Sequence, residues 1–284
     1  MKTLKTELIA CFDQLDTYVH LSFLEMQRDC RKGTIHALRV ALKRFRALLQ
    51  MLDALDPHFA GKPAIKKLKP LFEEAGKLRA LQILDAILHA QEEKLQMEHV
   101  HSAKIRQRIG AQQRFFDEFI HSYSFAEIRE ASLQARSHLL HLGLRALRSG
   151  LRGYFRDLLQ DISRLSREGL SSKKRLHDLR KNIKKVHYNL LVILETNPSL
   201  SLPAEPVQAL ENAQNLLGKW HDQHLAFREA KDMSDAPKLF LRQLRQEERL
   251  CLQEVRIALV QLPPQVECLL QEAEHMLAPK PTAC

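Results

Sequence analysis

The sequence contains few of the residues that interrupt helices. Its 284 residues include only 9 Gly and 11 Pro, and aromatic residues make up 6% of the chain. Runs of β-branched residues are also few, whereas apolar residues recur at intervals of three and four positions, which is the period of a helix with one buried face. Because glycine and proline mark most turns and breaks, this composition predicts an all-α fold.

Cysteine is scarce and scattered, and long apolar runs are absent. The cysteines are scattered, odd in number and form no Cys-x-x-Cys pair, so neither a disulfide scaffold nor a zinc site is indicated, and a reducing cytoplasm is the natural compartment. No run of about 18 apolar residues occurs, and acidic residues interrupt the first 29 positions, unlike a signal peptide. We therefore expect a soluble cytoplasmic protein that begins near Met1, with no membrane insertion. The five cysteines are Cys11, Cys30, Cys251, Cys268 and Cys284.

Charge of one sign is in excess. The chain has 44 Lys and Arg against 34 Asp and Glu, which gives a formal net charge of +10. This excess favours an anionic partner such as nucleic acid, an acidic membrane surface or a polyphosphorylated ligand. A chain of this length with 45% hydrophobic residues can bury one large core or two modest ones.

Short segments rich in turn-forming residues divide the chain into about eight predicted helices. We read residues 126–167 as one long helix. Long helices with short connections are typical of antiparallel bundles. The predicted breaks lie at residues 30–34, 56–64, 98–103, 121–124, 167–172, 196–206, 233–237 and 262–264.

An internal repeat relates the two halves of the chain. Residues 35–52, IHALRVALKRFRALLQML, align with residues 176–193, LHDLRKNIKKVHYNLLVI. A Gly-Lys pair then follows, with its glycine 40 residues after the first histidine and 41 residues after the second. Two anchors kept in register over forty residues indicate two related helical halves, residues 1–125 and 126–284. The identical pairs are His36/His177, Leu38/Leu179, Arg39/Arg180, Lys43/Lys184 and Leu49/Leu190.

Helical geometry places a basic stripe beside the apolar face of each repeated helix. With about 100° of rotation per residue, the leucines and their apolar neighbours share one arc, and the basic residues occupy the arc next to it. In the first helix these are His36, Arg39, Lys43 and Arg46, with Arg28 and Lys32 added if the helix reaches back past Gly33. In the second helix they are Lys173, His177, Arg180, Lys184 and His187.

The simplest interpretation of one such stripe is a solvated flank whose Lys and Arg stems cover apolar surface. A flank does not require the same residues in the same order twice. Like charges one turn apart also destabilise an exposed helix by about 0.2–0.5 kcal/mol per pair. We therefore expect an anionic ligand to compensate them, and two helices of basic residues suit an extended polyanion better than a single phosphate.

At these residues the sequence resembles the CHAD family, named for a histidine α-helical domain. The motif His-x-x-Arg-x-x-x-Lys occurs twice, as HALRVALK and HDLRKNIK, and a downstream element occurs as LGKWHDQHLA. The resemblance implies two pseudo-symmetric antiparallel four-helix bundles around a basic central cavity or groove. It also implies binding of inorganic polyphosphate and, as for some members of the family, association with polyphosphate granules. The residues carried over are His36, Arg39, Lys43, Arg46, Lys173, His177, Arg180 and Lys184.

Further basic residues extend this candidate site. Arg79 follows the first Gly-Lys pair, and His187 stands where an Arg is usual in the family. A periodic set of arginines on the predicted helix 126–167 adds charge at intervals of three and four residues. These are Arg145, Arg148 and Arg152, followed by Arg156.

Four alternatives remain from the residues alone. RNA or DNA binding would use the same charge, but few aromatic side chains border the stripes to stack bases. A metal-binding bundle would use the spacing Glu-x-x-His at Glu118/His121 and Glu272/His275. An enzyme is disfavoured, because the stripes contain neither magnesium-binding carboxylates nor a glycine-rich phosphate loop. A helical scaffold for protein partners would leave the doubled basic stripe unexplained.

Overall fold

The computed structural model describes residues 4–56, 58–59, 61–168, 172–196 and 202–277. Over these ranges the chain forms nine α-helices and no strand, which confirms the all-α fold. None of the helices in these ranges is long and apolar enough to cross a membrane. The helices are α1 (Leu4–Arg28), α2 (Lys32–Leu55), α3 (Gly61–Lys94), α4 (Val100–Ser122), α5 (Ala126–His141), α6 (Leu144–Arg167), α7 (Lys173–Thr196), α8 (Ala204–Lys231) and α9 (Lys238–Met276).

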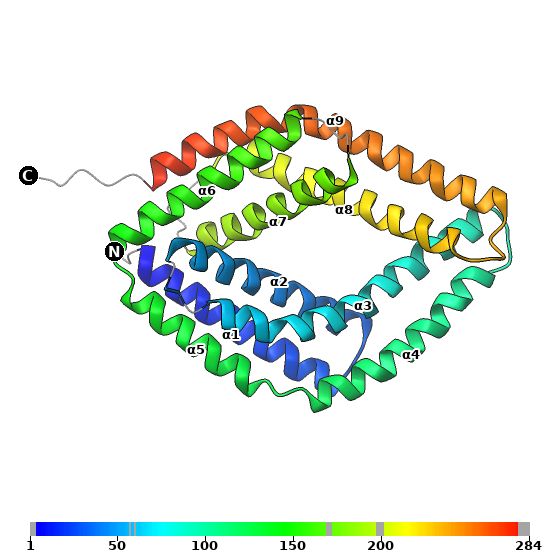
Figure 1. Ribbon diagram of the computed structural model, residues 1–284, viewed down its shortest axis with the longest axis horizontal. Coiled ribbons are helices and arrows are strands. Elements are labelled where there is room, and N and C mark those ends of the chain that lie inside the picture. The colour runs from blue at the N-terminus through cyan, green and yellow to red at the C-terminus, as the bar shows by residue number, and fades with distance from the viewer. Residues whose placement is uncertain (1–3, 57, 60, 169–171, 197–201, 278–284) are drawn as a thin grey trace, which may run out of the picture.

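The two repeated helices, α2 and α7, pack against each other near the centre of an elongated molecule (Figure 1). Around them, the packing of α1 on α2, α2 on α3 and α3 on α4 has counterparts in α6 on α7, α7 on α8 and α8 on α9. The crossed pairs also match, because α1 packs on α7 and α6 packs on α2. This pattern is compatible with two pseudo-symmetric halves, and α5 is the helix without a counterpart.

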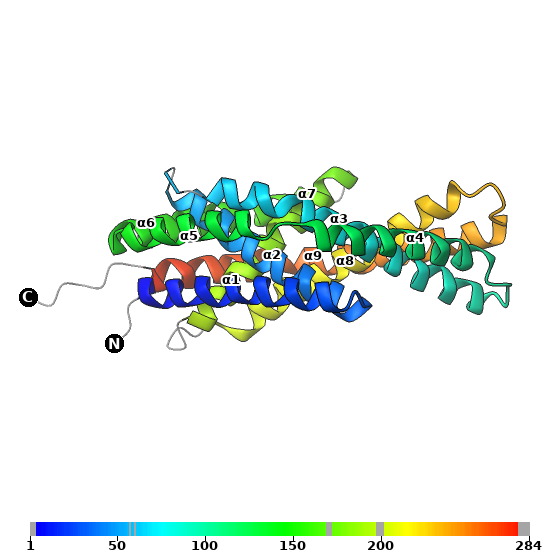
Figure 2. The ribbon, with the colours of Figure 1, turned by 90° about the horizontal axis from the view of Figure 1, so that it is seen from below.

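One large apolar core continues through all nine helices in the described part of the chain. The apolar arcs of both repeated helices are buried in it as predicted, since Leu38 and Phe45 of α2 and Ile183 and Val186 of α7 are at most 1% exposed. A smaller core joins α3, α4, α8 and α9. It lies at the end of the molecule away from the first turn of α1 and the last turn of α9 (Figure 2).

The expectation of a single helix over residues 126–167 was wrong. Helix α5 ends at His141, and the backbone is extended at Leu142 and at Gly143, which has a ψ of 142°. The chain therefore turns from α5 into α6, and residues 126–277 contain five described helices, where four were expected. The 3.6-residue period of the apolar side chains continues across the junction, so periodicity alone concealed the break.

The break expected at residues 262–264 was also wrong, because α9 continues through Pro263 and Pro264. Proline inside a helix removes a hydrogen bond and costs about 3 kcal/mol. Here Leu262 and Val266, on either side of the prolines, are each 1% exposed. Burial of α9 along its length outweighs the local cost. Two other predicted breaks contain residues 169–171 and 197–201, which lie outside the described residues, as does Cys284.

Candidate functional site

A cavity of about 1040 Å³ lies where α2, α3, α4, α7 and α8 meet. Both repeated motifs reach it, because His36, Arg39 and Lys43 enter from α2 while Arg180 and Lys184 enter from α7. The structure thus brings together five residues that lie up to 148 positions apart in the chain. The other lining residues that bear on its chemistry are Phe72, Gly76, Lys77 and Arg79 of α3, Arg108, Gln112 and Phe115 of α4, and His221, Asp222 and Glu229 of α8.

The cavity wall is strongly basic. Seven Lys or Arg side chains line it, against two carboxylates, Asp222 and Glu229. Glu229 accepts a hydrogen bond of 2.9 Å from Arg108 Nη1, so its charge is matched locally. Asp222 lies among the remaining cations. Burial raises the pKa of Asp222, and Arg180 is the strongest of the cations that act in the opposite direction.

Arg39 is held by α3. Its Nη1 donates a hydrogen bond of 3.2 Å to the carbonyl oxygen of Phe72, and its guanidinium carbon lies 5.1 Å from the centre of the Phe72 ring. The guanidinium of Arg46 contacts the same ring at 5.4 Å. Cations over an aromatic face are attracted by its electron density. One phenylalanine therefore positions two members of the first basic stripe.

Gly76 provides the space that Arg39 occupies. A Cβ atom at this position would lie 2.8 Å from Arg39 Nη1, which is closer than van der Waals contact allows. The repeated glycine of the second half, Gly218, has no atom within 4 Å of the equivalent point. The Gly-Lys pair therefore meets a steric requirement in the first half that is absent from the second.

The two repeated lysines are half-buried in the cavity wall. Burial, together with the nearby charge of Arg39, lowers the pKa of Lys43 to about 8. Burial lowers the pKa of Lys184 to about 7, assisted by Arg180 and by Lys43 itself. Desolvation and neighbouring like charges both disfavour an ammonium ion. An anion in the cavity would relieve the second of these effects directly.

Burial also disfavours the charged forms of the two repeated arginines. Burial lowers the pKa of Arg39, with a further contribution from Arg79, and burial lowers the pKa of Arg180 against the opposing effect of Asp222. Within the described residues, Arg180 Nε is buried without a hydrogen-bond partner. A buried guanidinium with an unused donor is costly, so an incoming acceptor would stabilise it.

Each motif histidine lies near the residue that follows the glycine of its own half by three positions. This residue is Arg79 for His36 and His221 for His177. Burial, followed by the charge of Arg79, lowers the pKa of His36. In the second half, the rings of His177 and His221 lie 6.0 Å apart, and burial lowers the pKa of His221 to about 4. Burial also lowers the pKa of His177. At neutral pH these imidazoles are uncharged, so Lys and Arg supply the positive charge of the cavity.

Two predicted residues lie in neighbouring pockets. Lys32 lines a pocket of about 350 Å³ that shares Arg79 and Asp222 with the main cavity. Lys173 lines a pocket of about 450 Å³ with Arg228, Lys231 and Arg245, and its Nζ lies 3.4 Å from His224 Nε2.

The remaining predicted residues do not line the main cavity in the described structure. Arg28 ends α1, and α2 begins at Lys32, so the first stripe does not extend back through Gly33 to Arg28. His187 is half-buried beside Tyr188, with ring centres 5.8 Å apart. The arginines of α6 lie elsewhere, and Arg152 Nη2 donates a hydrogen bond to the carbonyl oxygen of Leu277. This α6 group comprises Arg145, Arg148, Arg152 and Arg156.

Sequence reasoning missed several cavity residues. Phe72 and Arg108 lie on α3 and α4, outside the repeat, and no local pattern distinguishes them. Lys77 belongs to the first Gly-Lys pair of the repeat, but it was not predicted to belong to the site. The downstream element LGKWHDQHLA contains His221 and Asp222, but neither residue was predicted to belong to the site. The two Glu-x-x-His pairs do not belong to any described group of three metal-ligating side chains.

Comparison with known proteins places the chain in a family. The model of the CHAD domain family matches residues 8–231, which extend from α1 to the end of α8. The crystal structure of the CHAD domain from the plant Ricinus communis superposes with a TM-score of 0.68, covering 93% of this chain and 92% of the plant chain at 16% identity. That likeness concerns the fold. No curated protein matches the sequence. On the family match over most of its length, the chain belongs to the CHAD domain family.

Proposed function

We propose that this chain binds inorganic polyphosphate in the basic cavity. The observation that carries the proposal is the convergence of Arg39, Lys43, Arg180 and Lys184, two from each copy of the motif, on one cavity. Their charged forms are disfavoured in the unliganded protein, and a polyanion restores them. Family membership adds support, because CHAD domains are associated with polyphosphate binding.

An extended ligand fits better than a single phosphate. The main cavity holds about 1040 Å³ and adjoins the 350 Å³ pocket through Arg79, Ile83 and Asp222. Lys32 and Lys219 add further positive charge on the far side of this boundary. A polyphosphate chain carries one negative charge at each repeating unit, so it can pair with these separated cations in any register.

RNA is the second candidate, and one side chain favours it. Phe115 lines the cavity and is 51% exposed, so a base can stack on its ring. The other aromatic ring of the cavity, Phe72, is covered by Arg39 and Arg46. Substitution Phe115→Leu should weaken RNA binding several-fold and leave polyphosphate binding unchanged.

A competition experiment tests the proposal. The protein is titrated with long-chain polyphosphate, single-stranded RNA and duplex DNA at near-physiological salt. We expect polyphosphate to bind most tightly, with an affinity that falls steeply as salt increases, because counterions are released on binding. Equal or tighter binding of RNA would overturn the assignment.

Charge reversal tests the site. The double variant Arg39→Glu/Arg180→Glu should lower polyphosphate affinity by at least a hundredfold. The matched control, Arg145→Glu/Arg148→Glu on α6, changes the net charge equally and should lower the affinity by less than threefold. A large loss in the α6 variant, with binding retained in the cavity variant, would move the site to α6.

We further propose that the protein binds its ligand without chemical turnover, and that it associates with polyphosphate granules in the cytoplasm. One of the two cavity carboxylates, Glu229, is already paired with Arg108. Incubation with polyphosphate should therefore release no inorganic phosphate above the background of buffer alone. Granule association is tested by microscopy of a fluorescent fusion, in which Arg39→Glu/Arg180→Glu should abolish co-localisation.

The matched packing of α1–α4 and α6–α9 also supports one domain built of two related halves, residues 1–125 and 126–284. The proposed boundary falls at the connection between α4 and α5. Because one apolar core joins both halves in the described chain, we propose that neither half folds alone. Expression of residues 1–125 should give a chain without a cooperative thermal transition.

A further inference from the structure

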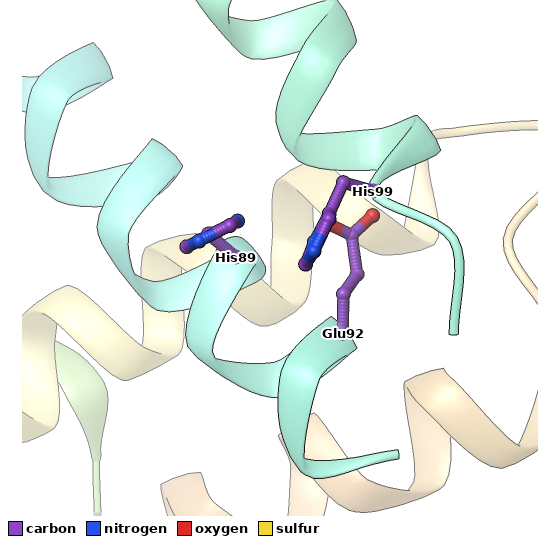
Figure 3. A group of neighbouring side chains, drawn as sticks. All are labelled: His89, Glu92 and His99. Carbon is purple, nitrogen blue, oxygen red and sulfur yellow. The ribbon is translucent and has the colours of Figure 1, made fainter. Parts of the chain in front are cut away.

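A second cluster of chemically reactive side chains lies at the end of the α3–α4 hairpin. His89 and Glu92 project from α3, and His99 immediately precedes α4 (Figure 3). One ligand atom of each residue lies within 4.8 Å of the others. Glu92 is completely buried, whereas the side chains of His89 and His99 are 39% and 43% exposed. The cluster is therefore anchored inside the protein and open on one side.

Hydrogen bonds fix the carboxylate of Glu92. Its Oε1 accepts hydrogen bonds from the backbone N–H of His101 at 2.7 Å and of Ser102 at 3.2 Å, and it lies 3.1 Å from His101 Nδ1. Its Oε2 accepts a longer hydrogen bond, of 3.4 Å, from the backbone N–H of Ser102. This second oxygen lies 3.6 Å from His99 Nδ1. One oxygen of the carboxylate thus holds α4 in place, and the other faces a histidine.

The histidines are arranged as ligands. Their ring centres are 4.3 Å apart. His89 Nε2 lies 3.5 Å from Glu93 Oε1, while in the described structure His89 Nδ1 is buried without a hydrogen-bond partner. Metal-binding histidines use one nitrogen for the metal and commonly direct the other to a carboxylate. His89 has this division of roles.

We propose that His89, Glu92 and His99 form a binding site for a divalent transition-metal ion of the zinc type. Two imidazole nitrogens and one carboxylate oxygen are a donor set that Zn²⁺ accepts, with water in the fourth position. Calcium and magnesium prefer sites composed largely of oxygen ligands. The proposal is independent of polyphosphate binding, because none of the three residues lines the basic cavity.

A bound ion would join the last turns of α3 to the beginning of α4. At present this corner is held by Glu92 and by the small apolar core that includes Leu88 and Ile105. A ligand that binds only the folded state raises the melting temperature. We expect saturating Zn²⁺ to raise the melting temperature of the full chain by about 5 °C.

Titration calorimetry tests the site. The full-length protein is treated with a chelator, dialysed, and titrated with Zn²⁺ in a buffer that contains no phosphate. We expect one ion per chain, and at least tenfold weaker binding in His89→Ala/His99→Ala. The control, His138→Ala/His141→Ala, removes two histidines from the end of α5 and should bind as the unaltered chain does.

Two outcomes would overturn the proposal: absence of Zn²⁺ binding by the unaltered chain, and unchanged binding by His89→Ala/His99→Ala. Circular dichroism establishes that each variant is folded. If the double variant unfolds, the single variant His99→Ala replaces it, because this side chain is 43% exposed and its loss leaves the core intact. Co²⁺ provides a second measurement, since its visible absorption bands should appear with the unaltered chain and be lost with the variant.

Discussion

The lowered pKa values of the cavity lysines predict that polyphosphate affinity falls as pH rises. With pKa values of about 7 for Lys184 and about 8 for Lys43, half of Lys184 and most of Lys43 are charged at pH 7. At pH 9 the charged fractions are about one hundredth and one tenth, since each pH unit above a pKa reduces the fraction tenfold. If the ligand binds only the fully charged cavity, affinity falls about 500-fold between pH 7 and pH 9, or about 4 kcal/mol.

Other groups change little over this interval. The pKa values of His36 and His177 are lowered below 6.5, mainly by burial, so these imidazoles are already neutral at pH 7. Burial raises the pKa of Tyr188 above 10, so its hydroxyl stays protonated at pH 9. Long polyphosphate chains keep the contribution of their titrating end groups small. The lysines therefore dominate the expected pH dependence.

The assay is a fluorescence titration with long-chain polyphosphate at pH 7, 8 and 9 and constant ionic strength. The comparison is the variant Lys43→Arg/Lys184→Arg, because arginine remains charged throughout this range. Its affinity should change less than fivefold. An unaltered protein whose affinity is constant from pH 7 to pH 9 would refute the reasoning, as would an arginine variant with the same pH dependence as the parent.

Two other predictions separate stability from binding. Gly76→Ala should displace the flexible end of Arg39, whose Nη1 would lie 2.8 Å from the new Cβ atom, and so weaken polyphosphate binding about tenfold without loss of melting temperature. Gly218→Ala, which meets no atom within 4 Å, should leave binding unchanged and stabilise α8 by about 0.5–1 kcal/mol; equal effects of the two substitutions on binding would contradict the assigned role of Gly76. Lys184→Met should raise the free energy of unfolding at pH 7 by about 1 kcal/mol or more, because the charged lysine is disfavoured in the fold, and should weaken polyphosphate binding. The pKa of Lys184 is near 7 in the folded protein and near 10.5 in the unfolded chain, so this gain in stability should shrink as pH rises from 7 to 10. Chemical denaturation at several pH values measures the change. A Lys184→Met protein that is less stable than the parent at pH 7 would show that the charge of Lys184 is already compensated within the fold.

The predicted elements followed from short-range patterns. The buried faces of α2 and α7 follow from a period of 3.6 residues, which is a property of each helix alone. The two basic stripes follow from the same geometry, and the repeat identified Arg39, Lys43, Arg180 and Lys184 before their positions were known. Local patterns also misled where tertiary packing decided the outcome. Pro263 stays inside α9 because the residues on both sides of the prolines are buried. At Gly143 the extended backbone ends a helix, although the apolar period continues across it.

The sequence by itself determined the helical fold, the buried faces and the surplus of positive charge next to them, because these depend on residue type and on spacing within one helix. Only the tertiary structure decided which cations share a cavity, since Arg108 and Phe72 join the site from helices that carry no part of the motif. It also decided the pKa values of Lys43 and Lys184, which depend on burial and on charges from another helix. The tertiary structure also forms the cluster of His89, Glu92 and His99. The turn between α3 and α4 brings His99 close to two side chains of α3, and the sequence spacing alone does not predict this.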